Sequence, residues 1–369
     1  MIERARAFRV GGSTPLEVTS ARASFGERRG LLLALTCEHD VTTFGEASPL
    51  LGFSRETLDE VERALAGVDW RRLQVPRDVA GLRASPSMVS QASLRFAIET
   101  ALGSLAAERS GVSLGAWLSG RALEGPLPCS VLVGRLGAPE SLLEAERALA
   151  SGARSLKLKV SLAEAIHARD TLPAFRRAVG DAVELRVDFN GTLGDLSMKE
   201  MLDVLAAFDG HGVAFAEEPC SGAGLVALGA LPLPWFADES LIDLRLQRAL
   251  LEHPHIAGAV LKPTLLGGLI AAWDLAQGFL ARGKGVVITH AFEGSVALAA
   301  CAELALGLGS AARAPGLTAH AALPSFGLPV PPQIRSASAS IAPALGATGL
   351  GLDAAPLLDN KQALFEWTR

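Results

Sequence analysis

Five short segments of the sequence carry charged residues of the kinds that bind metal ions or move protons. They are SLKLKV with Lys157 and Lys159, RVDFN with Asp188, FAEEP with Glu217, FADES with Asp238, and AVLKP with Lys262. A set of carboxylate oxygens suits a hard cation, and Mg²⁺ fits best, with Mn²⁺ as an alternative. A lysine buried beside other cations can lose its proton near neutral pH and act as a base. The segments therefore predict a divalent-metal site flanked by lysines.

Two of these segments offer a choice of carboxylate, because Glu218 follows Glu217 and Glu239 follows Asp238. Adjacent side chains on a strand point to opposite faces, so only one member of each pair is expected in a common site. We choose Glu217 and Asp238, in part because of the family resemblance given below. A single strand-end carboxylate is more often a helix cap or an ion-pair partner, but three in series indicate a shared site.

The two lysines of K-x-K lie two residues apart, so a strand would place Lys157 and Lys159 on one face. In the alternative orientation both would face solvent, with Leu156 and Leu158 inside. Lys262 would reach the same site from the opposite side of a barrel. Lysines on both sides of a metal-bound carboxylate are arranged to remove its α-proton and to stabilise the resulting enediolate. This is a reaction class and does not yet fix a substrate.

The segments that carry these residues belong to a repeating pattern of short apolar strands and helical stretches. Strands are predicted at Cys129–Val133, Ser155–Val160, Glu184–Phe189, Val213–Glu217, Trp235–Asp238, Gly258–Lys262, Gly285–Thr289 and Gly316–His320. Their spacing leaves room for one crossover helix each, which predicts a parallel α/β barrel. The charged residues fall at strand ends, where barrel enzymes place their chemistry.

The first third of the chain has a different pattern and predicts a separate α+β unit. Strands are expected at Leu31–Leu35 and in VTTFGEASPL, followed by helices at Ser54–Leu65 and about Ser87–Glu108. The expected division is an α+β domain over 1–122, a barrel over 126–325, and a tail at 340–369 that returns to the first domain. With 369 residues, the chain has the length for both units.

Composition excludes several classes of partner. Charged residues make up 20% of the chain and the net charge is −5, so nucleic acid and anionic membrane surfaces are not expected partners. Neither a signal peptide nor an apolar run of about 18 residues is present, and the four cysteines show no metal-binding spacing. These features predict a cytoplasmic protein with buried thiols and a small-molecule carboxylate substrate, and they leave the oligomeric state open.

His290, in VITHAFEG, follows the predicted seventh strand. In some enzymes of the type that the sequence resembles, described below, a histidine at this place works as a base with an aspartate on the preceding strand, but here that strand supplies Lys262. We therefore expect His290 to line the substrate site or to support the structure.

The motifs K-x-K, D-x-N, E-E-P, A-D-E-S and K-P, in this order, resemble the muconate lactonizing subgroup of the enolase superfamily over nearly the whole chain. Within that subgroup, TSARASFGERRGLLLAL, FGEASPLLGFSRETL, the arginine of RVDFN and EEPC resemble the o-succinylbenzoate synthase family. The resemblance implies an α/β fold, a modified TIM barrel (β/α)7β with an α+β capping domain. It also implies Mg²⁺ held by Asp188, Glu217 and Asp238.

The same resemblance implies a reaction. Lys159 would remove a proton from 2-succinyl-6-hydroxy-2,4-cyclohexadiene-1-carboxylate and return it to the departing hydroxyl, giving 2-succinylbenzoate for menaquinone biosynthesis. Lys262 would stabilise the anionic intermediate from the opposite face. Substrate contacts would come from Lys157, Arg186, Asn190, Glu293, Gly294 and Ser295, and a loop over about Ser20–Glu27 would close over the site.

Rival activities keep the same site. An N-acylamino acid racemase also needs two lysines on opposite faces, and a muconate cycloisomerase uses these lysines as well. A dipeptide epimerase is expected to carry an acidic pair after the eighth strand, and LTAHAAL has none. A barrel without catalytic function would be expected to lose one of the two lysines, Lys159 and Lys262, or one of the three acids, and all five are present.

Overall fold

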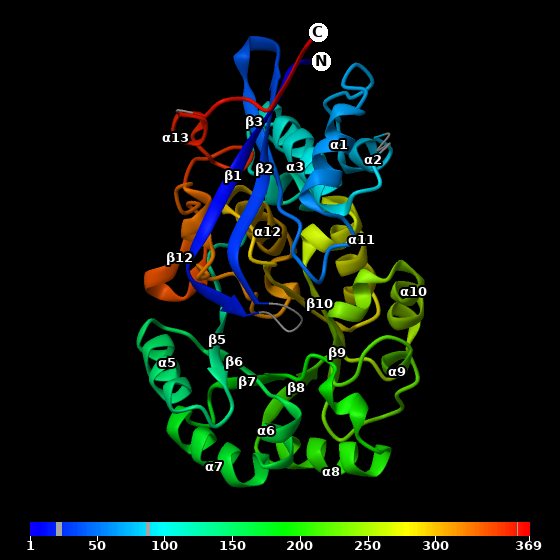
Figure 1. Cartoon of the computed structure of the whole chain (residues 1–369), viewed down its shortest axis with the longest axis vertical. Coiled ribbons are helices and arrows are strands. Elements are labelled where there is room, and N and C mark those ends of the chain that lie inside the picture. Colours follow the sequence, from blue (N-terminus) through cyan, green and yellow to red (C-terminus); the bar gives the residue numbers. More distant parts are fainter. Residues whose placement is uncertain (20–23, 86–88, 360) are drawn as a thin grey trace.

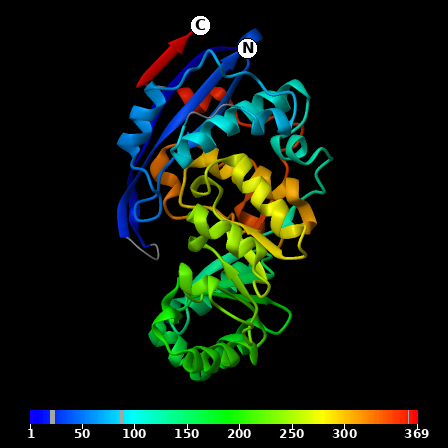
Figure 2. The ribbon, with the colours of Figure 1, turned by 90° about the vertical axis from the view of Figure 1, so that its right-hand side faces the viewer.

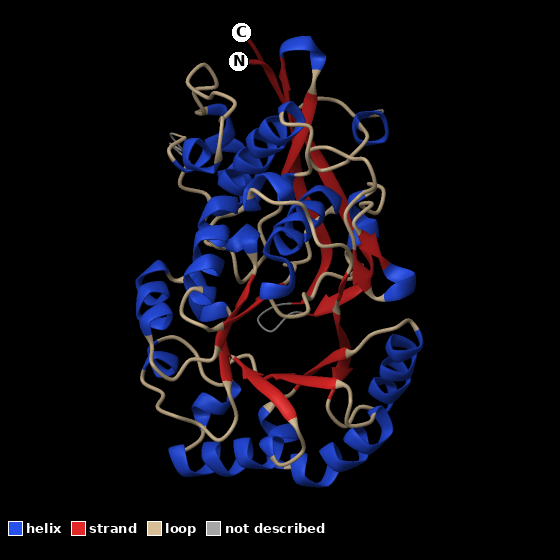
Figure 3. Cartoon of the chain, turned by 180° about the vertical axis from the view of Figure 1, so that it is seen from behind, coloured by secondary structure: helices blue, strands red, loops and turns tan. Residues whose placement is uncertain are grey.

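The computed structural model describes residues 1–19, 24–85, 89–359 and 361–369. The molecule is elongated, with an antiparallel sheet at one end and a ring of parallel strands at the other (Figure 1). The ring has helices on its outer side, as in a TIM barrel (Figures 2 and 3). No helix in the described ranges is long and apolar enough to cross a bilayer.

The antiparallel sheet is built from both ends of the chain. Its strands are β1 (Ile2–Thr19), β2 (Ser24–Cys37), β3 (Thr42–Ala47) and β14 (Phe365–Thr368), in the order β14-β1-β2-β3. The register pairs Arg4 with Thr368, so the last residues of the chain extend the first sheet.

Four helices follow β3 in the sequence: α1 (Leu58–Ala66), α2 (Val79–Arg83), α3 (Ala92–Arg109) and α4 (Leu114–Ser119). The expected start of the first helix at Ser54 is wrong by about one turn. The helix begins at Leu58, because Thr57 and Glu60 form a capping box in which the Thr57 hydroxyl accepts from the Glu60 N–H and the Glu60 carboxylate accepts from the Thr57 N–H.

Seven of the eight predicted barrel strands are present. They are β5 (Ser130–Arg135), β6 (Ser155–Lys159), β7 (Glu184–Asp188), β8 (Val213–Glu217), β9 (Trp235–Ala237), β10 (Gly258–Leu261) and β11 (Gly285–Ile288), all parallel and in sequence order. Between and after them run α5 (Pro139–Ala150), α6 (Leu162–Ile166), α7 (Ala168–Val179), α8 (Met198–Asp209), α9 (Ala223–Val226), α10 (Leu244–Glu252), α11 (Leu269–Leu280) and α12 (Ser295–Leu308). The α/β barrel prediction is confirmed.

The predicted eighth strand at Gly316–His320 is wrong as a regular strand. Its place is taken by an irregular segment with one parallel bridge, between Thr289 and Gly316. On one side the Gly316 N–H donates to the carbonyl of Ile288 (2.8 Å), and on the other the Ser130 N–H donates to the carbonyl of Pro315 (2.8 Å). Pro315 has no N–H to donate to a strand ladder, yet the segment still joins β11 to β5 and closes the ring.

The remaining elements are short. They are β4 (Leu127–Pro128), β12 (Ile334–Arg335) and β13 (Ser340–Ile341), which form a small sheet, the helix α13 (Ala354–Leu358), and 3-10 turns at Glu38–Asp40, Thr192–Asp195, Glu239–Ile242, Pro263–Leu265, Gly309–Ala311, Leu323–Phe326 and Ser336–Ser338. The four cysteines are free and buried, as predicted.

The barrel interior below the site is filled by aromatic packing. The rings of Phe215 and Phe236 stack with centroids 3.9 Å apart, and Val260 and Val287 complete this cluster. A Cβ atom added at Gly258 would clash with the Phe236 ring and with a neighbouring backbone carbonyl. A glycine is therefore required where strand and ring approach this closely.

Buried carboxylates join the two parts of the molecule by capping helices across their interface. Glu46 of β3 accepts hydrogen bonds from the N–H groups of Gly294 (2.6 Å), Val296 (3.1 Å) and Ala297 (3.2 Å) at the start of α12. Glu99 of α3 accepts from the Ile270 N–H (2.9 Å) at the start of α11. Each carboxylate satisfies backbone donors that would otherwise be buried without partners, so the helices are tied to the antiparallel part.

Candidate active site

A pocket of about 840 Å³, including its open mouth, lies at the carboxyl ends of the barrel strands. Residues from β5, β6, β7, β8, β10 and β11 form its wall, and Leu50 and Phe53 from the loop after β3 also line it. The site therefore combines a charged floor from the barrel with apolar residues from the first part of the chain.

The two lysines of β6 both face this pocket. Leu156 and Leu158 are fully buried on the other side of the strand, whereas Lys157 and Lys159 line the pocket. The alternative orientation, with both lysines in solvent, is excluded. The register places Lys159 beside Asp188 and Asp188 beside Glu217, so the ends of three adjacent strands meet at the site.

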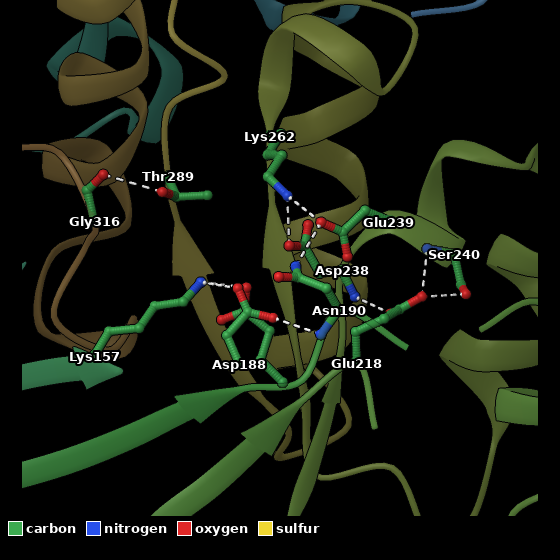
Figure 4. A network of polar contacts seen from close by, with 11 residues as sticks. Lys157, Asp188, Asn190, Glu218, Asp238, Glu239, Ser240, Lys262, Thr289 and Gly316 are labelled. Atoms are coloured by element: carbon green, nitrogen blue, oxygen red, sulfur yellow. Dashed lines mark hydrogen bonds and ion pairs between the residues drawn. The ribbon is translucent and has the colours of Figure 1, made fainter. Parts of the chain in front are cut away.

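Lys157 is held by two carboxylates. Its Nζ lies 2.8 Å from Asp188 Oδ2 (Figure 4). The same Nζ lies 2.5 Å from Glu217 Oε1. Burial alone would lower the pKa of Lys157, but the charges of Asp188 and Glu217 outweigh it and raise that pKa. Lys157 is therefore an ammonium ion whose charge is already paired.

Lys262 is held in a similar way on the other side of the pocket. Its Nζ lies 2.5 Å from Asp238 Oδ2 and 3.1 Å from Glu239 Oε1 (Figure 4). The same Nζ lies 5.6 Å from the centroid of the Phe53 ring, within range of a cation–π contact. Burial alone would lower the pKa of Lys262, but the carboxylates of Asp238 and Glu239 raise it.

Lys159 differs from the other two lysines. Among the residues that the structure describes, its ammonium group has no hydrogen-bond or ion-pair partner, while Lys157 and Lys262 have two each. Burial lowers the pKa of Lys159, and the nearby charges of Lys157 and Lys262 lower it further. The charge of Asp188 raises this pKa, but it offsets only part of the decrease. Of the three, Lys159 is the lysine disposed to exist as a neutral amine.

Glu239 is a residue that the alternation argument missed. We expected only Asp238 to face the site, but the Glu239 carboxylate lines the pocket, contacts Lys262, and accepts from Asn190 Nδ2 (3.3 Å). The strand β9 ends at Ala237 and a 3-10 turn begins at Glu239, so strand alternation no longer applies there. For the other pair the expectation holds: Glu217 lines the pocket and Glu218 accepts from the N–H groups of Asp238 and Ser240.

The donor chemistry fits a hard divalent cation. Asp188 and Glu217 share Lys157, and the carboxyl groups of Glu217 and Asp238 lie within hydrogen-bonding reach of each other. Burial and the charge of Glu239 raise the pKa of Asp238, which marks an excess of buried negative charge, and Glu239 Oε2 is buried without a hydrogen-bond partner in the described residues. Among the described residues, no three acidic, histidine or cysteine side chains are grouped as a metal site, and the ammonium groups of Lys157 and Lys262 lie against the carboxylates.

Two further predicted residues lie at the pocket floor. Arg186 lines it, but its guanidinium points to the base, where Nε donates to Glu184 Oε1 (2.6 Å) and Nη1 donates to the carbonyl of Ala314 (2.8 Å). Asn190 lines the pocket with a positive φ of 46°, and its N–H donates to Asp188 Oδ1 (3.0 Å). Asn190 is thus tied to both Asp188 and Glu239.

The segment after β11 faces the pocket with other residues than expected. Ala291 and Phe292 line it, whereas Glu293, Gly294 and Ser295 are buried behind them and are not part of the described wall. The Glu293 carboxylate turns inward to accept from the Ala291 N–H and from Cys301 Sγ. Burial raises the pKa of Glu293 to about 7. Of the expected loop over 20–27, residues 20–23 lie outside the described residues and 24–27 begin β2.

The loop that carries Leu50 and Phe53 is fixed by Arg28, which we did not single out from the sequence. This buried arginine donates to the carbonyls of Pro49 (2.7 Å), Ser48 (3.0 Å) and Phe292 (2.9 Å). Burial lowers the pKa of Arg28 to about 10. Arg28 lies ahead of the predicted strand Leu31–Leu35, between Glu27 and Arg29, so no local feature of the sequence distinguished it from an exposed charged residue.

Comparison with known proteins gives the family. Residues 140–356 match the family described as Enolase C-terminal domain-like. An o-succinylbenzoate synthase from Enterobacter sp. (strain 638) is 31% identical over 294 residues, which cover 75% of this chain and 79% of that protein. The o-succinylbenzoate synthase of Yersinia pseudotuberculosis serotype O:3 (strain YPIII) is 28% identical over 311 residues, covering 83% and 87%.

Solved structures agree on the fold. The muconate lactonizing enzyme of Pseudomonas fluorescens, complexed with muconolactone, has a TM-score of 0.79 at 22% identity and covers 98% of this chain and 99% of its own. The L-Ala-D/L-Glu epimerase of Bacillus subtilis also has a TM-score of 0.79 at 22% identity, covering 95% and 98%. The chain therefore belongs to the enolase superfamily, with the fold of the muconate lactonizing enzymes, and is an enzyme that resembles the o-succinylbenzoate synthases.

Proposed function

We propose that this enzyme is an o-succinylbenzoate synthase, which dehydrates 2-succinyl-6-hydroxy-2,4-cyclohexadiene-1-carboxylate to 2-succinylbenzoate in menaquinone biosynthesis. The observation that carries the proposal is the contrast among the pocket lysines, in which Lys159 alone lacks a partner in the described residues. A syn elimination needs one base on one face of the ring, and the site offers one lysine in that condition. Relatives with this name at about 30% identity support the same choice.

Lys159 would act twice. As a neutral amine it takes the proton from the ring carbon next to the carboxylate, and the electron pair of that C–H bond enters the ring system. The resulting ammonium then gives its proton to the hydroxyl as the C–O bond breaks, so that water leaves and an aromatic ring remains. Lys262, held by Asp238 and Glu239, would stay an ammonium ion on the other side and stabilise the intermediate's negative charge.

Asp188, Glu217 and Asp238 would hold a divalent cation, most simply Mg²⁺, because they offer only carboxylate oxygens. When bound, the cation supplies electrostatic stabilisation of the negative charge that develops on the substrate carboxylate. Lys157 is paired with Asp188 and Glu217. If a cation took up part of the negative charge of these two carboxylates, Lys157 would be free to contact the substrate carboxylate.

The second candidate is an N-acylamino acid racemase. It is favoured by one observation: Lys262, directly after β10, lines the same pocket as Lys159 of β6, so two lysines from different strands are available. Racemisation requires each lysine to serve in turn as base and acid. Lys262 is engaged by two carboxylates, which favours the one-base reaction.

The test is a direct assay of the purified protein with Mg²⁺. The cyclohexadiene carboxylate is followed by formation of the aromatic product, and N-succinyl amino acids are followed by exchange of the α-proton in D₂O. Turnover of the first substrate supports the synthase. Turnover of the amino acids alone would assign the racemase in its place, and the absence of both activities would refute each proposal.

A further inference from the structure

His290 lies in the site without a role in the reaction described above. It lies two residues after the end of β11 and lines the same pocket as the three lysines. A histidine in this position has two alternative chemical roles, as a proton acceptor or as a hydrogen-bond donor. The choice depends on which ring nitrogen carries the proton.

The backbone fixes the proton of His290. The N–H of Phe292 donates to His290 Nδ1 at 3.3 Å. A nitrogen that accepts a hydrogen bond carries no proton, so in the neutral ring the proton is on Nε2. Nδ1 is turned to the backbone of Phe292, which leaves Nε2, on the far side of the ring, for the pocket. Within the described ranges, Nε2 has no protein partner.

A second histidine holds the plane of the ring. The rings of His290 and His320 lie with centroids 4.4 Å apart and planes inclined by 34°. His320 Nε2 lies 2.9 Å from the carbonyl of Glu293, and since a carbonyl only accepts, this nitrogen carries the proton of His320. His320 Nδ1 is buried and has no partner in the described chain. The ring of His320 therefore supports His290 by packing.

The surroundings keep the His290 ring uncharged. Burial lowers the pKa of His290 well below its usual value, and the charges of His320 and of the three pocket lysines act in the same direction. Burial also lowers the pKa of His320 to about 4. An uncharged imidazole with Nδ1 engaged has no lone pair to offer the substrate, so a base at this position would first have to break the contact with Phe292.

We propose that His290 is a hydrogen-bond donor to a carbonyl or carboxylate oxygen of the substrate, through Nε2–H, and takes no part in proton abstraction. The identity of that substrate rests on the proposed function, whereas the tautomer of His290 does not. A neutral donor binds oxygen without adding charge to a pocket that already holds three lysines.

The first experiment compares three variants by steady-state kinetics on the substrate that the wild type turns over. His290→Phe keeps the ring shape but removes the donor, so we expect KM to rise about tenfold with kcat changed much less. His290→Gln restores an N–H near the position of Nε2 and should recover most of that loss. His167→Gln changes an exposed histidine and is the control. A His290→Phe enzyme with wild-type KM, or one that loses kcat alone, would overturn the proposal.

The second experiment needs no turnover. Ring ¹⁵N shifts of histidine-labelled protein, with His290 assigned from its absence in His290→Gln, report the protonated nitrogen directly. We expect the Nε2–H form with no titration between about pH 6 and pH 9. An Nδ1–H form or a cationic ring in that range would overturn the proposal. If the wild type is inactive on both substrates, this result still stands or falls by itself.

Discussion

At the scale of single residues, the site gives different chemistry to three identical side chains. Lys157 and Lys262 are each held by two carboxylates, whereas the half-buried Lys159 has no partner in the described chain. Burial opposes a charge on all three, but the neighbouring carboxylates raise the pKa of Lys157 and Lys262, whereas the pKa of Lys159 is lowered. The division of labour therefore comes from the neighbours of each lysine, and a sequence pattern of lysines alone does not contain it.

This contrast predicts a pH dependence. The reactive form of Lys159 is the neutral amine, so kcat/KM should fall by about tenfold per pH unit as the pH drops below the lowered pKa of Lys159. Replacing Lys159 by cysteine and alkylating it with 2-bromoethylamine installs a less basic amine, which should restore activity and move this limb to lower pH. The same treatment of Lys199→Cys, at an exposed position, is the control. If the acidic limb of the pH profile does not move, it reports the ionisation of a group other than Lys159.

The site residues predicted correctly from the sequence are those that lie within a regular strand. Asp188 and Glu217 are the last residues of β7 and β8, and both line the pocket. Alternation required that only one of Glu217 and Glu218 face the site, and the choice of Glu217 rested partly on the family resemblance. Glu239 was missed because β9 ends two residues earlier. Phe53 was missed because it comes from a loop far away in the sequence, and such contacts depend on the packing of the two parts of the molecule.

At the scale of elements, short apolar runs were enough to place seven barrel strands, but closure of the ring was not predictable in detail. Gly316 and its neighbours pair with β11 through the N–H groups of Arg313 and Gly316 and with β5 through the N–H of Ser130, without the ladder of a regular strand. The spacing of apolar residues did not reveal this irregular pairing, because the segment has the composition of a strand. Helix caps that cross between distant elements, such as Glu46 on α12, leave no local signal either.

The cap by Glu46 predicts a large effect on stability. Glu46→Ala leaves three buried N–H groups at the start of α12 without their acceptor, which should lower the free energy of unfolding by about 2–4 kcal/mol. Glu60→Ala removes a cap at the exposed start of α1 and should cost only about 0.5–1 kcal/mol. Urea unfolding of both variants measures the difference. Equal decreases in the free energy of unfolding would show that the buried cap by Glu46 stabilises the protein no more than the exposed cap by Glu60.

The strand glycine beneath the site gives another test. Gly258→Ala pushes a methyl group into the Phe236 ring and a neighbouring carbonyl, so it should destabilise the barrel by about 1–3 kcal/mol or more. Gly229→Ala is the matched control, because a methyl group there meets nothing within 4 Å. Thermal unfolding should separate the two. A Gly258→Ala protein as stable as the control would mean that the strands and the ring have room to move apart.

At the scale of the whole molecule, the site depends on both ends of the chain. The barrel supplies the charged groups, and the loop after β3 supplies Leu50 and Phe53. Arg28 fixes this loop to the segment after β11 through Phe292. The pocket is therefore complete only when the two parts are packed together, which agrees with the extended match to enolase-superfamily structures over 98% of the chain.

Metal binding should stabilise the whole fold, because a cation would offset the buried negative charge of Asp188, Glu217 and Asp238. At Mg²⁺ about 100 times above its Kd, the free energy of unfolding should rise by about 2.7 kcal/mol. Asp238→Asn should lose most of this gain, whereas Asp195→Asn, at an exposed position, should keep it. Unfolding with and without Mg²⁺ measures this, and an equal gain in the Asp238 variant would argue against these ligands.

The most direct measurement is the turnover of the cyclohexadiene carboxylate by Lys159→Ala beside the wild type. Removal of the base should lower kcat by about a thousandfold, while the variant keeps its fold and its stabilisation by Mg²⁺. Lys199→Ala controls for loss of a lysine elsewhere. Turnover by Lys159→Ala near the wild-type rate would contradict the assignment of Lys159 as the base.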